Sequence, residues 1–157
     1  MMTVIRLLVY GGRRYDDKRR VWTEMDSLTA RYDKRATIVI HGDATGADAH
    51  AKAWAVRWKD AGVIELPFPA DWKNITRHGA IVRFRIDVGH YDIMAGFVRN
   101  QRMIDEGKPT HALEFPGGSG TADMRARIMK ANQAGAAIKL RIVLDQNPIK
   151  RARTDNT

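Results

Sequence analysis

The sequence has no cysteine among its 157 residues, which excludes disulfides and thiolate metal sites. It has no apolar run near the roughly 20 residues that a membrane-spanning helix needs. The N-terminus also lacks the pattern of a secretory signal peptide. These absences predict a soluble cytoplasmic protein that makes no contact with a membrane.

Motifs of several common chemistries are missing as well. The five histidines show no ligand pairing at helical or hairpin spacing, and acidic clusters are absent. No serine stands in a nucleophile elbow, and the Walker A pattern is absent. We therefore predict no metal site and no cofactor, and we expect no hydrolysis of ATP.

The composition is that of a globular protein, with 44% hydrophobic and 29% charged residues. Its length favours a single domain with a real core. The net charge is +9, from 27 Lys and Arg against 18 Asp and Glu. This excess favours polyanionic partners or small phosphorylated ligands. A solvated basic surface would give the same excess, so both interpretations stay open.

Short apolar runs alternate with segments of helical spacing along the chain. The predicted strands cover residues 4–10, 37–41, 62–68, 110–115 and 137–144. Four helices are predicted. The first follows an N-cap at Asp17 and the second starts at Ala47, while the third covers 92–106 and the fourth covers 122–134, with Gly135 as its C-terminal stop. Between the third and fourth strands, a short helix or a hairpin is expected around residues 81–88.

Strands that are apolar throughout and alternate with helices predict a mainly parallel five-stranded sheet, covered on both faces. The long connection between the third and fourth strands is the place where the chain crosses back, which gives the order 3-2-1-4-5. The ends of the first and fourth strands then lie side by side, where ligands bind in open α/β sheets. We expect one domain over residues 1–144 and a basic tail over 145–157.

The loop after the fourth strand is the strongest functional signal. Its glycines let the backbone turn tightly and approach a ligand, and Thr121 adds a hydroxyl where a helix begins. The N–H groups of a helix start suit an anion, so the loop predicts a phosphate cradle, although a plain β–turn–α connection would look similar. The candidate ligand-binding residues here are Pro116, Gly117, Gly118, Ser119, Gly120 and Thr121.

Two earlier loops add candidates. The first loop contributes Gly11, Gly12 and Arg13, because the arginine fork matches phosphate. The second contributes Gly42 and Asp48, whose carboxylate either holds a ribose hydroxyl, fixes the loop or only complements a helix dipole. His41 in the same loop is either a general acid or base or a hydrogen-bonded wall residue.

Further along, Trp72 is a candidate for stacking on a base, or else a packing residue. Arg99 and Asn100 are candidates for binding phosphate and sugar, or else belong to a solvated helix face.

Five motifs occur in a fixed order along the chain. They are Gly11-Gly12-Arg13-Arg14, His41-Gly-Asp-Ala-Thr-Gly-Ala-Asp48, Pro69-Ala-Asp-Trp72, Ala95-Gly-Phe-Val-Arg-Asn100-Gln-Arg-Met103 and Phe115-Pro-Gly-Gly-Ser-Gly-Thr-Ala-Asp-Met124. This order resembles the YspA-type, cpYpsA-related branch of the SLOG superfamily, from Val4 to about Leu144. The resemblance implies a Rossmann-like three-layer fold, a nucleotide or nucleotide-derived ligand such as ADP-ribose or NAD, and a role near phage, plasmid or stress functions.

The chain departs from the family pattern in two places. An insertion at about 76–94 follows the Trp72 motif. We expect it to act as a lid, a dimer contact or a basic docking surface. Related LOG-type phosphoribohydrolases carry an acidic residue where this chain has Met124, and Asp123 lies one position earlier. A carboxylate there would stabilise an oxocarbenium-like centre or activate water. Asp123 is therefore the candidate catalytic residue if the protein is an enzyme.

Three functions follow as hypotheses. The first is a protein that binds a nucleotide-derived small molecule, as a sensor or sequestering module. The second is a nucleotide N-glycosidase of the phosphoribohydrolase type. The third is nucleic-acid binding, by analogy with the related DprA and from the arginines in the insertion and in the tail, Lys150-Arg151 and Arg153. A homodimer is also expected, because related enzymes often dimerise.

Overall fold

The computed structural model describes residues 2–145, so the predicted tail lies outside the described residues apart from Asp145. The main sheet has five strands in the order β3-β2-β1-β6-β7, all parallel. These strands are β1 (Ile5–Tyr10), β2 (Thr37–His41), β3 (Ile64–Pro67), β6 (His111–Glu114) and β7 (Lys139–Ile142). Since β6 and β7 are the fourth and fifth strands of this sheet, the predicted order 3-2-1-4-5 is confirmed.

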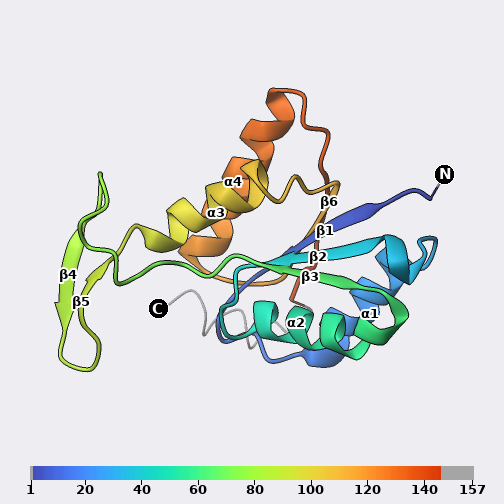
Figure 1. The fold of residues 1–157 in the computed structure, drawn as a ribbon, viewed down its shortest axis with the longest axis horizontal. Helices are drawn as coiled ribbons and strands as arrows, with labels where there is room; N and C mark the ends of the chain where they lie inside the picture. The colour runs from blue at the N-terminus through green and yellow to red at the C-terminus, as the bar shows by residue number, and fades with distance from the viewer. Residues whose placement is uncertain (1, 146–157) are drawn as a thin grey trace.

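Helices cover both faces of the sheet, as a Rossmann-like three-layer fold requires (Figure 1). Ile5, Leu7 and Val9 of β1 join a core cluster with α1 (Lys18–Thr29) and α2 (Ala47–Arg57). Leu8 and Tyr10 point to the opposite face, where α3 (Ala95–Asp105) and α4 (Ser119–Gln133) pack. This two-residue alternation explains why β1 is apolar on both faces, with the half-buried Arg6 as its one charged residue. Two short 3-10 turns, 34–36 and 59–61, precede β2 and β3.

The edge strands differ from the expectation that every strand is buried. In β3 and β7, most positions are exposed or half-buried, whereas β1 is almost entirely buried. An edge strand has a neighbouring strand on only one side, and β3 and β7 are the two edges of this sheet. The apolar pattern therefore identified these strands correctly but overstated their burial.

The helix starts decide how the loops are presented. Asp17 is the N-cap of α1, as predicted, and accepts a hydrogen bond from the Arg20 N–H at 3.0 Å. Helix α4 begins at Ser119, three residues before the predicted start at 122. Ser119, Gly120 and Thr121 therefore form its first turn, so the candidate phosphate loop is partly helix. Helix α3 begins at Ala95, since residue 92 belongs to a strand.

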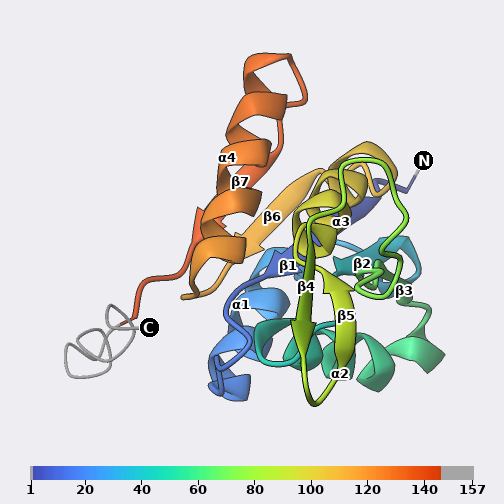
Figure 2. The ribbon, with the colours of Figure 1, turned by 90° about the vertical axis from the view of Figure 1, so that its left-hand side faces the viewer.

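The insertion forms a β-hairpin of β4 (Val82–Arg85) and β5 (Gly89–Asp92), which was one of the two forms expected there. It projects from the body of the molecule beside α3 (Figures 1 and 2). Its tip is open to solvent, with Ile86 96% exposed. In the described part of the chain, no helix has the length and apolar character to cross a membrane.

Candidate functional site

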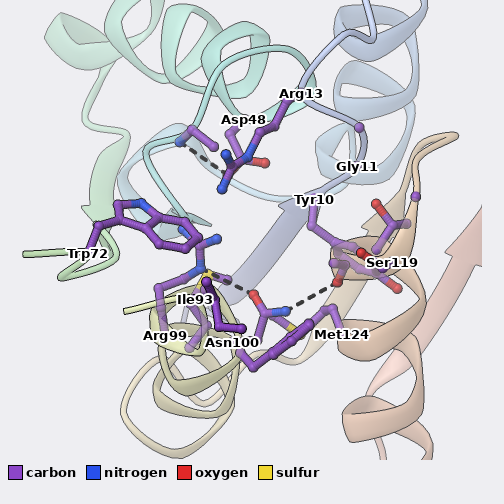
Figure 3. A pocket seen from close by; sticks show the side chains of 18 residues that line it. Tyr10, Gly11, Arg13, Asp48, Trp72, Ile93, Arg99, Asn100, Ser119 and Met124 are labelled. Carbon is purple, nitrogen blue, oxygen red and sulfur yellow. Dashed lines mark hydrogen bonds between the residues drawn. The ribbon is translucent and has the colours of Figure 1, made fainter. Parts of the chain in front are cut away.

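A cavity of about 340 Å³ lies where β1 and β6 end and α3 and α4 begin (Figure 3). This is the predicted switch point of the sheet, and the volume is at the lower end of the range for small-molecule sites. Most predicted ligand-binding residues line it: Gly11, Gly12, Arg13, Asp48, Arg99, Asn100, Gly118, Ser119, Gly120 and Thr121. Gly42, Pro116 and Gly117 are not among the lining residues.

The first and last glycine loops touch directly through their main chains. The Gly12 N–H donates to the Pro116 carbonyl at 2.9 Å. A Cβ on Gly12 would lie 2.7 Å from that same carbonyl oxygen, and a Cβ on Gly117 would lie 2.6 Å from the Gly12 nitrogen. Pro116 and Gly117 therefore hold the two loops together from behind the cavity. The expected meeting of distant loops is confirmed, because Arg13 and Thr121 line the same cavity.

The second loop supports the first one. Gly46 has a φ of +76°, and a Cβ there would collide with the Gly12 carbonyl oxygen. That oxygen accepts hydrogen bonds from the Tyr15 N–H at 3.1 Å and from the Ala47 N–H, at the start of α2, at 3.2 Å. The Thr45 hydroxyl donates to the Arg13 carbonyl at 3.1 Å. The first N–H of α2 is thus bound by the Gly12 carbonyl, and neither α2 nor α4 has a side-chain cap.

Asp48 fixes the second loop from inside. The residue is 5% exposed, and its Oδ2 accepts hydrogen bonds from the Gly42 N–H at 3.0 Å and from the Ala44 N–H at 3.4 Å. Burial raises the pKa of Asp48, while the Arg99 guanidinium opposes this rise. These hydrogen bonds favour the loop-fixing role among the alternatives for Asp48, and its side chain still reaches the cavity wall.

Arg99 and Asn100 join the separate walls of the cavity. An Arg99 Nη donates to the Gly42 carbonyl at 2.5 Å, and Gly42 has no Cβ that would occupy the space of this guanidinium. The Asn100 amide donates to the Gly120 carbonyl at 3.2 Å and to Asp123 Oδ2 at 3.0 Å. Burial lowers the pKa of Arg99, and Asp48 opposes this shift. The pair belongs to the cavity wall, and the alternative of a solvated helix face is wrong because Asn100 is buried.

His41 is a wall residue behind the cavity. Its ring is fully buried, with Nε2 2.8 Å from Glu65 Oε1. Its Nδ1 accepts the Asp43 N–H at 3.0 Å, so the ring proton must lie on Nε2 and point to Glu65. Both ring nitrogens are therefore occupied, and His41 does not line the cavity. This geometry favours the wall role over the role of general acid or base.

Catalysis by Asp123 would need its carboxylate in the cavity, but Met124 lines the cavity and Asp123 does not. Met124 is 1% exposed and lines the cavity. Asp123 is not among the lining residues, and its Oδ2 accepts hydrogen bonds from Asn100 and from Arg127 Nε at 2.8 Å. Asp123 thus connects α3 with α4. Asp123 is only one residue away from the expected acidic position. Consecutive side chains on a helix differ in direction by about 100°, so the two positions face different ways.

Trp72 and Arg13 lie together at the cavity. Trp72 follows β3, and the Arg13 guanidinium carbon lies 5.0 Å from the centre of its ring. Both residues were candidates from the sequence, but their contact with each other was not expected.

Seven lining residues were not among the ligand-binding candidates from the sequence, namely Tyr10, Ala44, Ile93, Gly96, Phe97, Met103 and Met124. Tyr10 immediately precedes the first glycine loop, which was the available signal. Its hydroxyl donates to the buried Glu114 carboxylate at 2.8 Å, and Arg125 binds that carboxylate through Nε and an Nη. Burial, followed by the hydrogen bond to Glu114, raises the pKa of Tyr10 far above its usual value. Among residues 2–145, no cluster of side chains suits a metal ion.

The fold and the cavity at its switch point define a Rossmann-like α/β protein. Residues 5–75 match the family model described as the YspA, cpYpsA-related SLOG family. The match includes the first three of the five ordered motifs and confirms the resemblance over these residues, and it suggests nucleotide-related binding or processing. It ends before the hairpin, so α3, α4 and the loop between β6 and α4 lie beyond it. No curated protein matches the chain.

Proposed function

We propose that the protein binds a nucleotide or a nucleotide-derived molecule, such as ADP-ribose or NAD, in this cavity, as a sensor or sequestering module. The observation that carries the proposal is the meeting of two glycine loops, Arg13 and the start of α4 around one cavity. The family match to residues 5–75 supports the same class of ligand. Dimerisation, nucleic-acid contact, cytoplasmic location and a phage-related role stay predictions.

The phosphate end of the ligand belongs at the start of α4. The first N–H groups of a helix have no partner inside the helix and suit an anion. No side chain caps this end, and Gly118 and Gly120 have open space where a Cβ would be. Ser119, Gly120 and Thr121 line the cavity there. A phosphate can thus approach the backbone of this turn closely.

Charge in the cavity favours the same ligand. Arg13 and Arg99 both line it, and Asp48 is the one acidic side chain among the lining residues. Arg99 is already bound to the Gly42 carbonyl, whereas Arg13 is exposed and lies over Trp72. Arg13 is therefore the residue that can turn to a phosphate and bind it through two N–H groups.

The direct test is to identify the small molecule that the purified protein carries and the compounds that it binds. Mass spectrometry of small molecules released from the purified protein should detect a nucleotide or a derivative. Nucleotides, ADP-ribose and NAD should also be screened for a rise in thermal midpoint, since a ligand that binds only the folded state stabilises it. Finding neither a released ligand nor a rise with any of these compounds would contradict the proposal.

A matched pair of variants tests the place of binding. Arg13→Ala should weaken the affinity for a phosphorylated ligand about tenfold or more, because it removes a charge-assisted hydrogen-bond donor. Arg14→Ala makes the same change in net charge at the neighbouring residue, but Arg14 does not line the cavity. Titration calorimetry should show little change for Arg14→Ala. Equal losses in both variants would mean that only the general positive charge matters.

The N-glycosidase hypothesis is less well supported by this geometry. Hydrolysis by Asp123 needs its carboxylate in the cavity, where Met124 lies instead. A survey of base release across nucleotides tests the hypothesis directly. If release occurs, Asp123→Asn should leave its rate unchanged, because Asp123 joins α3 to α4 and does not face the ligand.

A further inference from the structure

Trp72 forms one side of the cavity, across from the start of α4. Figure 3 shows its ring on one side and Ser119 on the other, with Arg13 reaching in between. Ile93, Gly96 and Phe97 also line the cavity, and Gly96 lies beside the Trp72 ring. A ligand with a charged end at α4 would thus place its other end against the Trp72 ring.

Trp72 differs from the other three tryptophans. Trp54 is fully buried in the core, and Trp22 and Trp58 pack against the same core cluster. Trp72 belongs to neither core cluster of the described residues and is half-buried. Its cavity-side neighbour is the charged Arg13 of a glycine loop. A role in core packing alone therefore does not account for its position.

The base of the hairpin holds Trp72 in place. The Asp92 N–H donates to the Trp72 carbonyl at 2.7 Å. The buried Asp92 carboxylate accepts hydrogen bonds from the Ile81 and Met94 N–H groups at 3.0 and 2.9 Å and from Arg77. At Gly96 a Cβ would lie 3.2 Å from the Trp72 ring, so the glycine leaves room for the indole. The Trp72 wall is thus built partly by the insertion.

We propose that Trp72 is the platform on which the base of the ligand stacks, while Arg13 leaves the ring to bind the phosphate. The Arg13 guanidinium is a planar cation near the ring centre, which is where a planar base would stack. The inference rests on the proposed function and makes it more specific. The ligand class is then a molecule with both a phosphate and an aromatic base, and a sugar phosphate alone binds less tightly.

The test compares AMP and ADP-ribose with ribose 5-phosphate, which has the phosphate and sugar but no base. Calorimetry on the wild-type protein should show AMP or ADP-ribose binding about 10- to 100-fold more tightly than ribose 5-phosphate. Trp72→Leu should reduce this ratio to near one, because it removes the aromatic face on which the base stacks. Trp72→Phe, which keeps an aromatic face, should retain most of the preference.

The outcomes separate the two proposals. If ribose 5-phosphate binds as tightly as AMP and ADP-ribose, or if Trp72→Leu keeps the preference, the role of Trp72 is refuted but phosphate binding is not. If none of the three compounds binds, the role of Trp72 is refuted as well, and the wider nucleotide screen above decides the proposed function. Should Trp72→Leu fail to fold, nuclear Overhauser contacts between base protons and the indole of the wild-type protein decide instead, and their absence refutes the stacking.

Discussion

A methyl group at Gly117 would have no space, and this predicts a large effect of Gly117→Ala on stability. The added Cβ would lie 2.6 Å from the Gly12 nitrogen and 2.9 Å from the Gly12 Cα, and it would also collide with the Thr121 hydroxyl. The hydroxyl can rotate, but the two Gly12 atoms are main chain and are fixed by the hydrogen bond to Pro116. The loops must then separate.

The expected cost is about 3 kcal/mol, the upper end for overpacking, because backbone and not a flexible side chain has to move. For a chain of 157 residues, this lowers the thermal midpoint by about 6–12 °C. Gly120→Ala is the matched control, since a Cβ there meets nothing within 4 Å. It lies in the first turn of α4 and should stabilise the protein by about 0.5 kcal/mol.

Both variants replace one glycine by alanine in the same stretch, so they reduce the entropy of the unfolded chain by the same amount. The difference between them therefore reports the collision in the folded state together with the helix propensity gained at Gly120. Urea unfolding followed by circular dichroism measures both free energies of unfolding. If Gly117→Ala is as stable as Gly120→Ala, the two loops are not in the close main-chain contact described above.

Three further predictions concern side-chain hydrogen bonds that stabilise the fold. Burial raises the pKa of Asp92, but hydrogen bonds from Arg77, Met94 and Ile81 outweigh it and hold that pKa below its usual 3.8. The Asp92 carboxylate therefore stabilises the fold above pH 3.8, and this contribution is lost as the pH falls below that value. Asp92→Asn should lower the free energy of unfolding more at pH 6 than at pH 3 in urea titrations, and equal losses would contradict this. Tyr10→Phe removes the hydrogen bond to Glu114 and should cost about 1–2 kcal/mol by the same method, whereas no loss would mean that water replaces the hydroxyl. Asp17→Ala removes the N-cap of α1 and should cost about 1 kcal/mol, with Asp17→Asn retaining most of the stability as the control.

The order of the sheet was predictable because it depends on coarse signals. Buried parallel strands are apolar on both faces, and the one long connection marks where the chain crosses back. The limits of the elements were less predictable. The start of α4 was misplaced because Ser119 and Gly120 are typical of turns, yet here they continue directly into the helix. The exposure of β3 and β7 depends on their position at the edges of the sheet, which local sequence does not encode.

The cavity was predictable where it is made of loops and not where it is made of core-like residues. Tyr10, Met103 and Met124 face inward from a strand and two helices, so their sequence pattern is the same as that of core residues. Only the packing of α3 beside α4 turns them into a cavity wall. Gly42 and Gly117 show the reverse case. A glycine that makes room for protein atoms has the same sequence signal as one that makes room for a ligand.

The hairpin also divides the chain into two pieces that share the cavity. Residues before its exposed tip at Ile86 supply β1, β2, β3 and Trp72, and residues after it supply α3, β6, α4 and β7. Exposed loop tips are sites where a break in the chain is tolerated. A cut at this tip would leave two fragments whose shared contacts include the β1–β6 and β4–β5 strand pairs. Because a guest molecule touching both fragments favours their reassembly, such a split form would serve as a reporter of that molecule in solution.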